Sequence, residues 1–299
     1  MKTIALIGCG ALSHIFARNL LRILPGEFRI TGVMARHAGS AESFADTLDC
    51  RFFTEIDPLL ALKPDFVIEF AGGAAVREYG EAVLRSGANF IPASVGALAD
   101  PEFFNTLKTA AKKSGAKLFI PSGAIGGLDL MQVYALKGDA RVEIEDVKAP
   151  RSLEGAPGLK GRIPSATAEE VLFSGSVRDA IAAFPKNVNV AVTASIAAEA
   201  PNARVTVRSV PGLRENIHRI SLSNGLMHAE LSIASKPDPA NPKSSTSAAW
   251  SVIALLRNLV PYADAFHHSQ HHSGRFSRPR GASHGDDDSG GRRPEDSMV

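Results

Sequence analysis

Short apolar runs alternate with amphipathic stretches through the first part of the chain. The opening predicts a strand at residues 3–7, a helix at 13–24 that Pro25 and Gly26 end, and a second strand at 28–34. The alternation continues with predicted helices at 40–48, 57–62, 74–86 and 101–114 and predicted strands at 51–53, 66–69, 89–91 and 117–120. Because strands that alternate with helices form parallel sheets, the pattern predicts an α/β fold with a doubly wound sheet.

The pattern changes after residue 122, where several strands are expected in succession. Predicted strands lie at 141–148, 187–195, 204–209, 217–223 and 226–234, and a single helix is expected near 167–182. Strands that follow one another in this way favour a second, α+β domain with an open and mostly antiparallel sheet.

The last apolar stretch predicts an amphipathic helix at 245–257, and the segment Asn-Pro-Lys-Ser at 241–244 is its start signal. Beyond Phe266 the chain offers almost nothing to bury, so we expect a disordered tail. The predicted divisions are a first domain at 1–122, an α+β substrate and dimerisation domain at 123–244, a C-terminal helix at 245–258 that packs back on the first domain, and the tail at 267–299.

Composition and charge narrow the class of partner. The chain has 299 residues, enough for two modest domains, and 33 basic against 31 acidic residues give a net charge of +2. That balance supplies no broad electrostatic footprint for nucleic acid or for an anionic membrane, so a small-molecule substrate is favoured. Two cysteines and the absence of a long apolar segment are typical of a cytoplasmic protein without a disulfide framework.

A glycine loop joins the first predicted strand to the first predicted helix. Gly8 permits a tight turn, Gly10 lets the backbone approach a pyrophosphate, and Ala11 and Leu12 begin the helix whose free amides would face the negative charge. Ser13 stands where the usual fingerprint has its third glycine. The position of the loop inside a complete βαβ unit favours a Rossmann dinucleotide site over a merely structural turn.

The end of the second predicted strand bears on the choice of dinucleotide. A site selective for NAD usually offers a carboxylate there, whereas this strand ends in Val-Met-Ala-Arg, with Arg36 last. The guanidinium of Arg36 matches the geometry of the 2′-phosphate of NADP, and the alternative is an ordinary solvated loop arginine. We therefore expect NADP or NAD as the cofactor, with NADP bound at least as tightly.

Four short segments carry a more specific signal. They are Ser-Gly-Ala-Ile-Gly-Gly-Leu-Asp at 122–129, Phe-Pro-Lys-Asn-Val-Asn-Val-Ala at 184–191, Asn-Ile-His at 216–218 and Asn-Pro-Lys-Ser-Ser at 241–245. In this order and at these separations they resemble the L-aspartate dehydrogenase family, which includes proteins called aspartate dehydrogenase domain-containing. The resemblance spans about residues 1–258, and the chain departs from the family from about Leu259, where the histidine-rich tail begins.

The resemblance implies a homodimeric, NAD(P)-dependent enzyme that oxidises L-aspartate to iminoaspartate. Hydrolysis of iminoaspartate would give oxaloacetate and ammonia, or iminoaspartate would feed NAD biosynthesis. Residue by residue, the resemblance matches Ala124 and Asn189 to cofactor contacts, with Asn187 as the alternative to Asn189, and matches His218 to the catalytic histidine.

Elimination among the nine histidines also favours His218 as the base that such a reaction needs. His218 lies in a predicted strand beside two polar residues, Asn216 and Arg219, whereas a lone histidine is ordinarily structural. His228 is the competing strand histidine.

The remaining histidines have simpler interpretations. His14 and His37 are expected to be structural or solvated. The tail pairs at 267–268 and 271–272 have metal-binding spacing, but no scaffold surrounds them, so adventitious binding is the interpretation and no metal site is expected.

Aspartate brings two carboxylates, which need cationic or amide donors. Lys148 and Lys243 are candidates, each with the alternative of a surface lysine, and the glycine-rich turn at 123–127 is placed to present amides to a carboxylate or to the cofactor. The segment 94–98 follows a strand and should line the nicotinamide crevice.

Two rival functions stay open at this point. One is a related Rossmann reductase of the homoserine dehydrogenase or dihydrodipicolinate reductase kind. The other is a catalytically silent dinucleotide-binding regulator, which Ser13 and the unusual C-terminus make conceivable.

Overall fold

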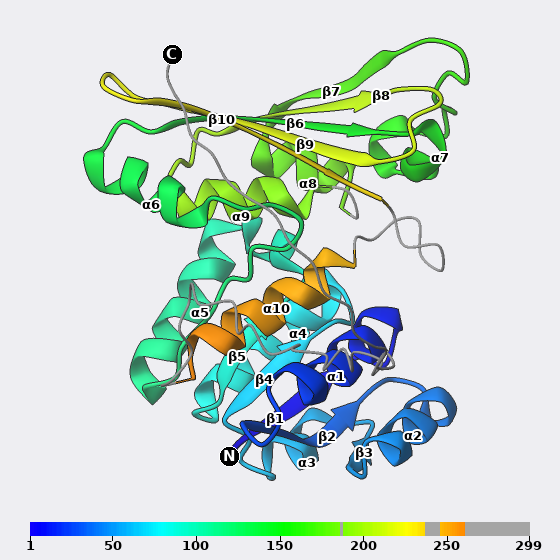
Figure 1. Cartoon of the computed structure of the whole chain (residues 1–299), viewed down its shortest axis with the longest axis vertical. Coiled ribbons are helices and arrows are strands. Elements are labelled where there is room, and N and C mark those ends of the chain that lie inside the picture. Colours follow the sequence, from blue (N-terminus) through cyan, green and yellow to red (C-terminus); the bar gives the residue numbers. More distant parts are fainter. Residues whose placement is uncertain (186–187, 237–245, 261–299) are drawn as a thin grey trace, which may run out of the picture. The chain divides into compact units, whose positions relative to one another are not determined.

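Two five-stranded sheets organise the described residues, which are 1–185, 188–236 and 246–260 in the computed structural model (Figure 1). All of these residues belong to one compact unit. The first sheet has the order β3-β2-β1-β4-β5, and the second has the order β10-β9-β6-β8-β7.

The first sheet is parallel throughout, so the predicted α/β, doubly wound fold is confirmed. Its strands are β1 (Lys2–Ile7), β2 (Phe28–Met34), β3 (Arg51–Phe53), β4 (Phe66–Glu69) and β5 (Asn89–Pro92). The helices between and after them are α1 (Ala11–Ile23), α2 (Ala38–Thr47), α3 (Ile56–Leu60), α4 (Gly73–Arg85), the 3-10 helix η1 (Val95–Ala99) and α5 (Pro101–Ser114). Every residue of β4 is buried, as expected for a strand covered by helices on both faces.

The strand order places the ligand crevice. The chain builds β2 and β3 on one side of β1 and then crosses to build β4 and β5 on the other side. Ligands of open α/β sheets bind outside the carboxyl ends of the strands where the order reverses, which here is between β1 and β4. The strand predicted at 117–120 is wrong, since only Leu118 forms an isolated bridge, with Phe90.

The second sheet is mixed, with β6 and β8 parallel and the other pairs antiparallel. Its strands are β6 (Arg141–Lys148), β7 (Glu170–Ser176), β8 (Arg204–Ser209), β9 (Asn216–Ser223) and β10 (His228–Ser235). The accompanying helices are α6 (Leu128–Lys137), α7 (Pro150–Leu153), the 3-10 helix η2 (Pro157–Leu159), α8 (Val177–Ala183) and α9 (Asn189–Ala197). Helices α6, α8 and α9 lie on one face of this sheet, which we call its inner face (Figure 1).

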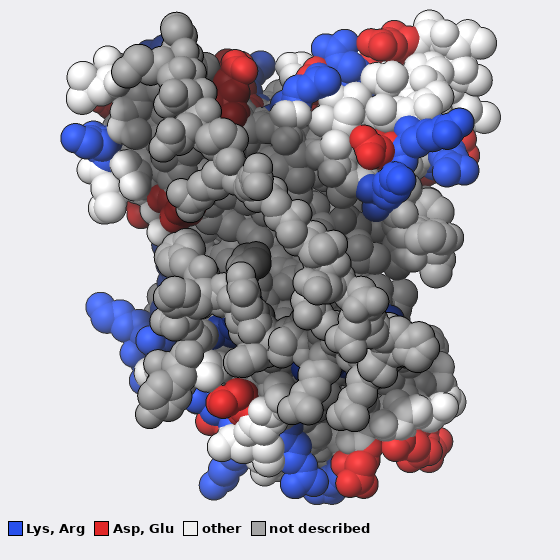
Figure 2. All heavy atoms as spheres, viewed as in Figure 1, with Lys and Arg blue, Asp and Glu red and all other residues white. Residues whose placement is uncertain are grey.

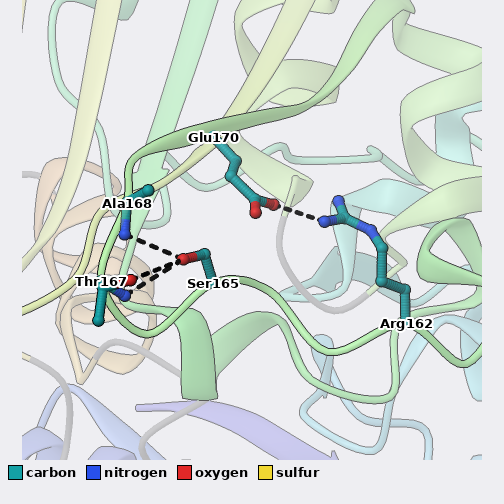
Figure 3. Close-up of polar contacts among 5 residues, drawn as sticks. All are labelled: Arg162, Ser165, Thr167, Ala168 and Glu170. Atoms are coloured by element: carbon teal, nitrogen blue, oxygen red, sulfur yellow. Dashed lines mark hydrogen bonds and ion pairs between the residues drawn. The ribbon is translucent and has the colours of Figure 1, made fainter.

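The helix predicted at 167–182 is wrong in its first half, which is strand β7. Ser165 Oγ accepts hydrogen bonds from the amides of Thr167 and Ala168, at 3.2 and 2.9 Å, and the backbone bends here just before the strand (Figure 3). An ion pair of 2.6 Å between Arg162 and Glu170 then fixes the start of the strand. The apolar run that follows fits a strand or a helix equally well by periodicity, and pairing with β8 decides for the strand.

The strand predicted at 187–195 is also wrong, because residues 189–197 form helix α9. Five consecutive residues of this helix, Val190 to Ala194, are buried, so it is covered on all sides. A helix buried all round carries no amphipathic stripe, and its alternating Asn and Val residues imitate the period of a strand. Asn187 lies outside the described residues.

The final helix, α10 (Ser247–Asn258), packs against the first sheet's layer of helices. Ala249, Val252 and Leu256 share an apolar cluster with Phe16 and Leu20 of α1. The predicted start signal at 241–244 and the tail at 267–299 lie outside the described residues.

Charged residues of both signs are interspersed on the described surface visible in Figure 2. Among the described residues, no helix has the length and apolar character that crossing a membrane requires.

Candidate active site

The glycine loop after β1 has the geometry of a dinucleotide cradle. Gly8 has φ +108°, and a Cβ there would lie 3.0 Å from the backbone nitrogen of Ala71, so a side chain would be both strained and crowded. The Gly8 amide donates to the carbonyl of Met34 at 2.8 Å, which brings the end of β2 beside the loop.

Gly10 and the start of α1 leave room for a ligand. A Cβ on Gly10 would meet nothing within 4 Å, and no side chain caps α1, whose first residues are the exposed Ala11 and the half-buried Leu12. The uncapped amides and the helix dipole favour an anion at this position. These features fit the pyrophosphate of a dinucleotide.

Ser13 accounts for the missing third glycine. Its side chain is buried, and its hydroxyl donates to the carbonyl of Gly8 at 2.9 Å. The serine therefore joins the first turn of α1 to the loop, and the departure from the glycine pattern does not disrupt the cradle.

Arg36 is exposed just beyond the end of β2. Within the described part of the chain, no hydrogen bond or ion pair holds its guanidinium, which is therefore available to an anion near the loop.

Glu69, at the end of β4, was missed by the sequence interpretation. Its buried carboxylate accepts hydrogen bonds from the amide of Gly72 and from the amide and hydroxyl of Ser94, the last two at 3.0 Å. Burial raises the pKa of Glu69, and these hydrogen bonds act in the opposite direction. Glu69 thus joins the loops that follow β4 and β5 at the crevice edge. An acid that ends an otherwise apolar strand is the sequence signal for such a role.

Asn189 connects the two halves of the described chain at this edge. Its Oδ1 accepts a hydrogen bond of 3.0 Å from the amide of Gly96 in η1. A Cβ on Gly96 would lie 2.4 Å from the same oxygen, so the contact requires a glycine. No described residue accepts a hydrogen bond from the carboxamide NH₂ of Asn189.

The loop that contains Ala124 is held by the last helix. The Gly123 amide donates to Ser251 Oγ of α10 at 3.0 Å, and Ala124 is half-buried beside it. The glycine-rich segment ends at Gly127, which precedes α6 and has φ +73°, a left-handed conformation that favours glycine.

His218 lies on the inner face of the second sheet, opposite Asp146 in the pairing of β9 with β6. The two side chains are 4% and 0% exposed, and His218 Nδ1 is hydrogen-bonded to Asp146 Oδ1. Because an ionised carboxylate only accepts, Nδ1 carries the proton and Nε2 is the nitrogen left to exchange protons.

The prediction that Arg219 is a polar neighbour of His218 is wrong, because Arg219 is exposed and forms an ion pair of 2.6 Å with Glu145. Successive residues of a strand point to opposite faces, so His218 and Arg219 cannot share a site. Asn216 does share the inner face. His228 is exposed, near Glu230, and has no buried partner of the Asp146 kind.

Two inner-face residues gain their significance from the structure: Asp146, which the sequence interpretation did not single out, and Lys148, which it named as a candidate donor to a substrate carboxylate. Lys148 is only 5% exposed, so its interpretation as a surface lysine is wrong; Lys243 lies outside the described residues. The signal was the alternation Val142, Ile144, Asp146, Lys148, which places two charged residues at inward positions of a strand.

Comparison with protein families divides the chain in the same way as its two sheets. A family model described as the C-terminal part of aspartate dehydrogenase matches residues 129–259, and one described as the NAD-binding domain of homoserine dehydrogenase matches residues 8–121. The L-aspartate dehydrogenase of Methanocaldococcus jannaschii is 34% identical over 261 residues, which are 87% of this chain and 97% of the relative. The chain belongs to the L-aspartate dehydrogenase family.

Other members of the L-aspartate dehydrogenase family agree in sequence and in structure. L-aspartate dehydrogenase 2 of Bordetella bronchiseptica is 37% identical over 257 residues, covering 85% of this chain and 95% of the relative. The crystal structure of aspartate dehydrogenase from Thermotoga maritima superposes with a TM-score of 0.67 at 28% identity and covers 87% of this chain and 97% of that chain. The first half of the chain is accordingly an NAD(P)-binding domain.

Proposed function

We propose that this protein is an L-aspartate dehydrogenase in which His218 is the catalytic acid and base and Gly8, Gly10, Ala11, Leu12, Arg36, Ala124 and Asn189 contact the dinucleotide. Membership of the L-aspartate dehydrogenase family supports the reaction. The single observation that carries the proposal is the buried hydrogen bond between His218 and Asp146, within a unit that also holds an open glycine loop.

The reaction has two steps. A bound nicotinamide would supply the hydride acceptor for the α-carbon of L-aspartate, and loss of one proton from the amino group would then leave iminoaspartate. Water then adds to the imine carbon, and His218 Nε2 takes the proton that the attacking water loses, which leads to oxaloacetate and ammonia. Asp146 stabilises the imidazolium form of His218 during this transfer.

The two rival functions fit the structure less well. The homoserine dehydrogenase description applies only to the dinucleotide-binding half, whereas the substrate half matches aspartate dehydrogenase. A silent regulator would not need the buried His218 and Asp146 pair, and Ser13 is accommodated by its bond to Gly8.

The assignment of His218 predicts the effect of its removal. His218→Ala should lower the turnover of L-aspartate by about 10²-fold or more, the usual scale for losing a general acid or base. Cofactor affinity should survive, and the pH profile of the variant should lack an ionisation that the unaltered enzyme shows.

His228→Ala is the matched control, because His228 is an exposed histidine of the neighbouring strand. It should leave turnover near normal. Near-normal turnover in the His218 variant together with loss in the His228 variant would show that the wrong histidine was chosen.

We also propose that NADP binds at least as tightly as NAD. The support is the exposed guanidinium of Arg36 next to the loop and the absence of a carboxylate in the segment 33–36 that ends β2.

Arg36→Ala should weaken NADP binding by about 10-fold or more, the scale of a hydrogen bond to a charged group, and leave NAD binding unchanged. Fluorescence titration with NADPH and NADH measures both. Arg141→Ala removes an exposed arginine of the second sheet and should change neither. Much tighter binding of NAD than of NADP, with no effect of Arg36→Ala, contradicts the phosphate pairing.

A homodimer is the assembly that we propose. The outer face of the second sheet, opposite α6, α8 and α9, has a hollow of about 650 Å³ where Glu145 binds both Arg208 and Arg219. A second copy of the chain would cover this face. Sedimentation equilibrium should give twice the chain mass, and Glu145→Lys should lower it; a monomeric mass for the unaltered protein contradicts the proposal.

The proposed location is the cytoplasm, with iminoaspartate available to NAD biosynthesis. The two cysteines are not joined by a disulfide, which suits a reducing compartment. Burial is the main cause that raises the pKa of the Cys50 thiol to about 11, so it stays protonated near neutral pH.

A further inference from the structure

Lys148 is the only lysine or arginine among the described residues that is buried. Lysines usually keep the ammonium in water and bury only the stem, and they are almost never fully buried without a partner. Its place in the fold therefore needs a reason.

No described residue supplies the partner. The nearest acid on the same face is Asp146, whose Oδ1 is taken by His218, and no carboxylate oxygen of the described chain lies within 4.0 Å of the Lys148 ammonium. Burial lowers the pKa of Lys148, and the charge of Asp146 only partly offsets it. A second negative charge beside the ammonium would complete its environment.

The register of the sheet groups Lys148 with other polar side chains. Lys148 pairs with Ser209 of β8, and Asn216 of β9 pairs with Ser235 of β10. All four residues lie on the inner face at an end of a strand: Lys148, Ser209 and Ser235 are the last residues of theirs, and Asn216 is the first of β9. The hydroxyls of Ser209 and Ser235 are buried without a hydrogen-bond partner in the described chain. Unpaired buried hydroxyls are rare in native proteins, and they favour this place for binding a polar group of a ligand.

The four residues Lys148, Ser209, Asn216 and Ser235 form a polar row across the strands, next to the row that holds Asp146 and His218. Asp146 and Lys148 are two residues apart on β6, as are His218 and Asn216 on β9, so the rows are separated by about 7 Å along the strands. The four-carbon stem of Lys148 is flexible, and the charge of Asp146 acts on the pKa of its ammonium. A small amino acid can therefore place one carbon beside His218 and, at the same time, bring a carboxylate that is one or two bonds from that carbon to the ammonium of Lys148.

We infer that Lys148, assisted by Ser209 and Asn216, binds a carboxylate of the amino-acid substrate and so places the α-carbon beside His218. The inference rests on the proposed function for the identity of that substrate. A carboxylate is the ligand because it restores the charge balance of the ammonium and accepts from the hydroxyl and the amide at the same time.

Lys148→Met keeps the length and the apolar stem of the side chain and removes its charge. It should raise the KM for L-aspartate by about 30-fold or more, the scale of losing one partner of a buried charge pair. Lys148→Arg should recover part of the loss. Lys137→Met, an identical change at an exposed position of the same half of the chain, should have no effect.

Calorimetric titration with succinate in the presence of NADP separates this inference from the proposed function, because succinate has both carboxylates and cannot be oxidised at an amino carbon. The unaltered protein should bind succinate, and Lys148→Met should weaken binding by the same factor, even in a protein that failed to oxidise aspartate. Failure of the unaltered protein to bind either succinate or L-aspartate overturns the inference.

Competition by L-asparagine, which has an α-carboxylate but no side-chain carboxylate, shows which carboxylate of L-aspartate contacts Lys148. If Lys148→Met weakens the binding of L-asparagine and of L-aspartate equally, Lys148 binds the α-carboxylate. If it weakens the binding of L-aspartate alone, Lys148 binds the side-chain carboxylate.

A fall in kcat with an unchanged KM and no recovery by Lys148→Arg would contradict the inference and identify Lys148 as a proton-transfer group. If Lys148→Met does not fold, Ser209→Ala provides the test. It should weaken succinate binding by about 10-fold, the scale of a hydrogen bond to a charged group. Unchanged binding in that variant overturns the inference.

Discussion

The hydrogen bond between Asp146 and His218 is the constraint on which the proposed site depends. A carboxylate buried in a protein is costly unless it is paired, and removing one partner of a buried charged pair costs about 3–5 kcal/mol. Asp146 has His218 as its hydrogen-bonded partner, and the antiparallel register of β6 with β9 sets the two side chains opposite each other. The pairing fixes the orientation of the imidazole and leaves Nε2 for proton exchange.

The two halves of the chain are held together by polar contacts at the crevice edge. Asn189 of α9 accepts from Gly96 of η1, and Gly123 donates to Ser251 of α10. Glu69 holds the loops that follow β4 and β5 in place by accepting hydrogen bonds from the amides of Gly72 and Ser94. The Asn189–Gly96 and Gly123–Ser251 bonds join residues that are 93 and 128 positions apart in the sequence, and they help to explain why a substrate sheet and a dinucleotide-binding sheet can form one site.

Much of the fold could be predicted because local signals agreed with tertiary structure. The strand at 28–34 was predicted with its observed bounds, and the glycine loop was recognised because its turn chemistry is local. Helix α9 was predicted as a strand and strand β7 as part of a helix, because tertiary contacts determine both elements: α9 is buried all round, and β7 pairs with β8. The hydrophobic periodicity of the sequence reveals neither the burial of α9 on all sides nor the pairing of β7 with β8.

The chemistry was predictable only in part for the same reason. His218 was found by motif and elimination, but Asp146 lies 72 residues away in sequence and becomes its neighbour only through strand pairing. Lys148 and Glu69 likewise acquire their character from burial. The sequence signal for Lys148 is an inward charged residue in an alternating strand, and the signal for Glu69 is an acid that ends an apolar strand.

The most direct test of the account is the turnover of Asp146→Asn, which keeps the size of the side chain and removes its charge. The account predicts a loss of L-aspartate turnover of about 10²-fold or more, because the imidazolium of His218 loses its partner. NADP affinity, measured on the same sample, should stay close to that of the unaltered protein, which shows that the variant is folded. Turnover equal to that of the unaltered enzyme would contradict the claim that the buried Asp146 and His218 pair carries the reaction.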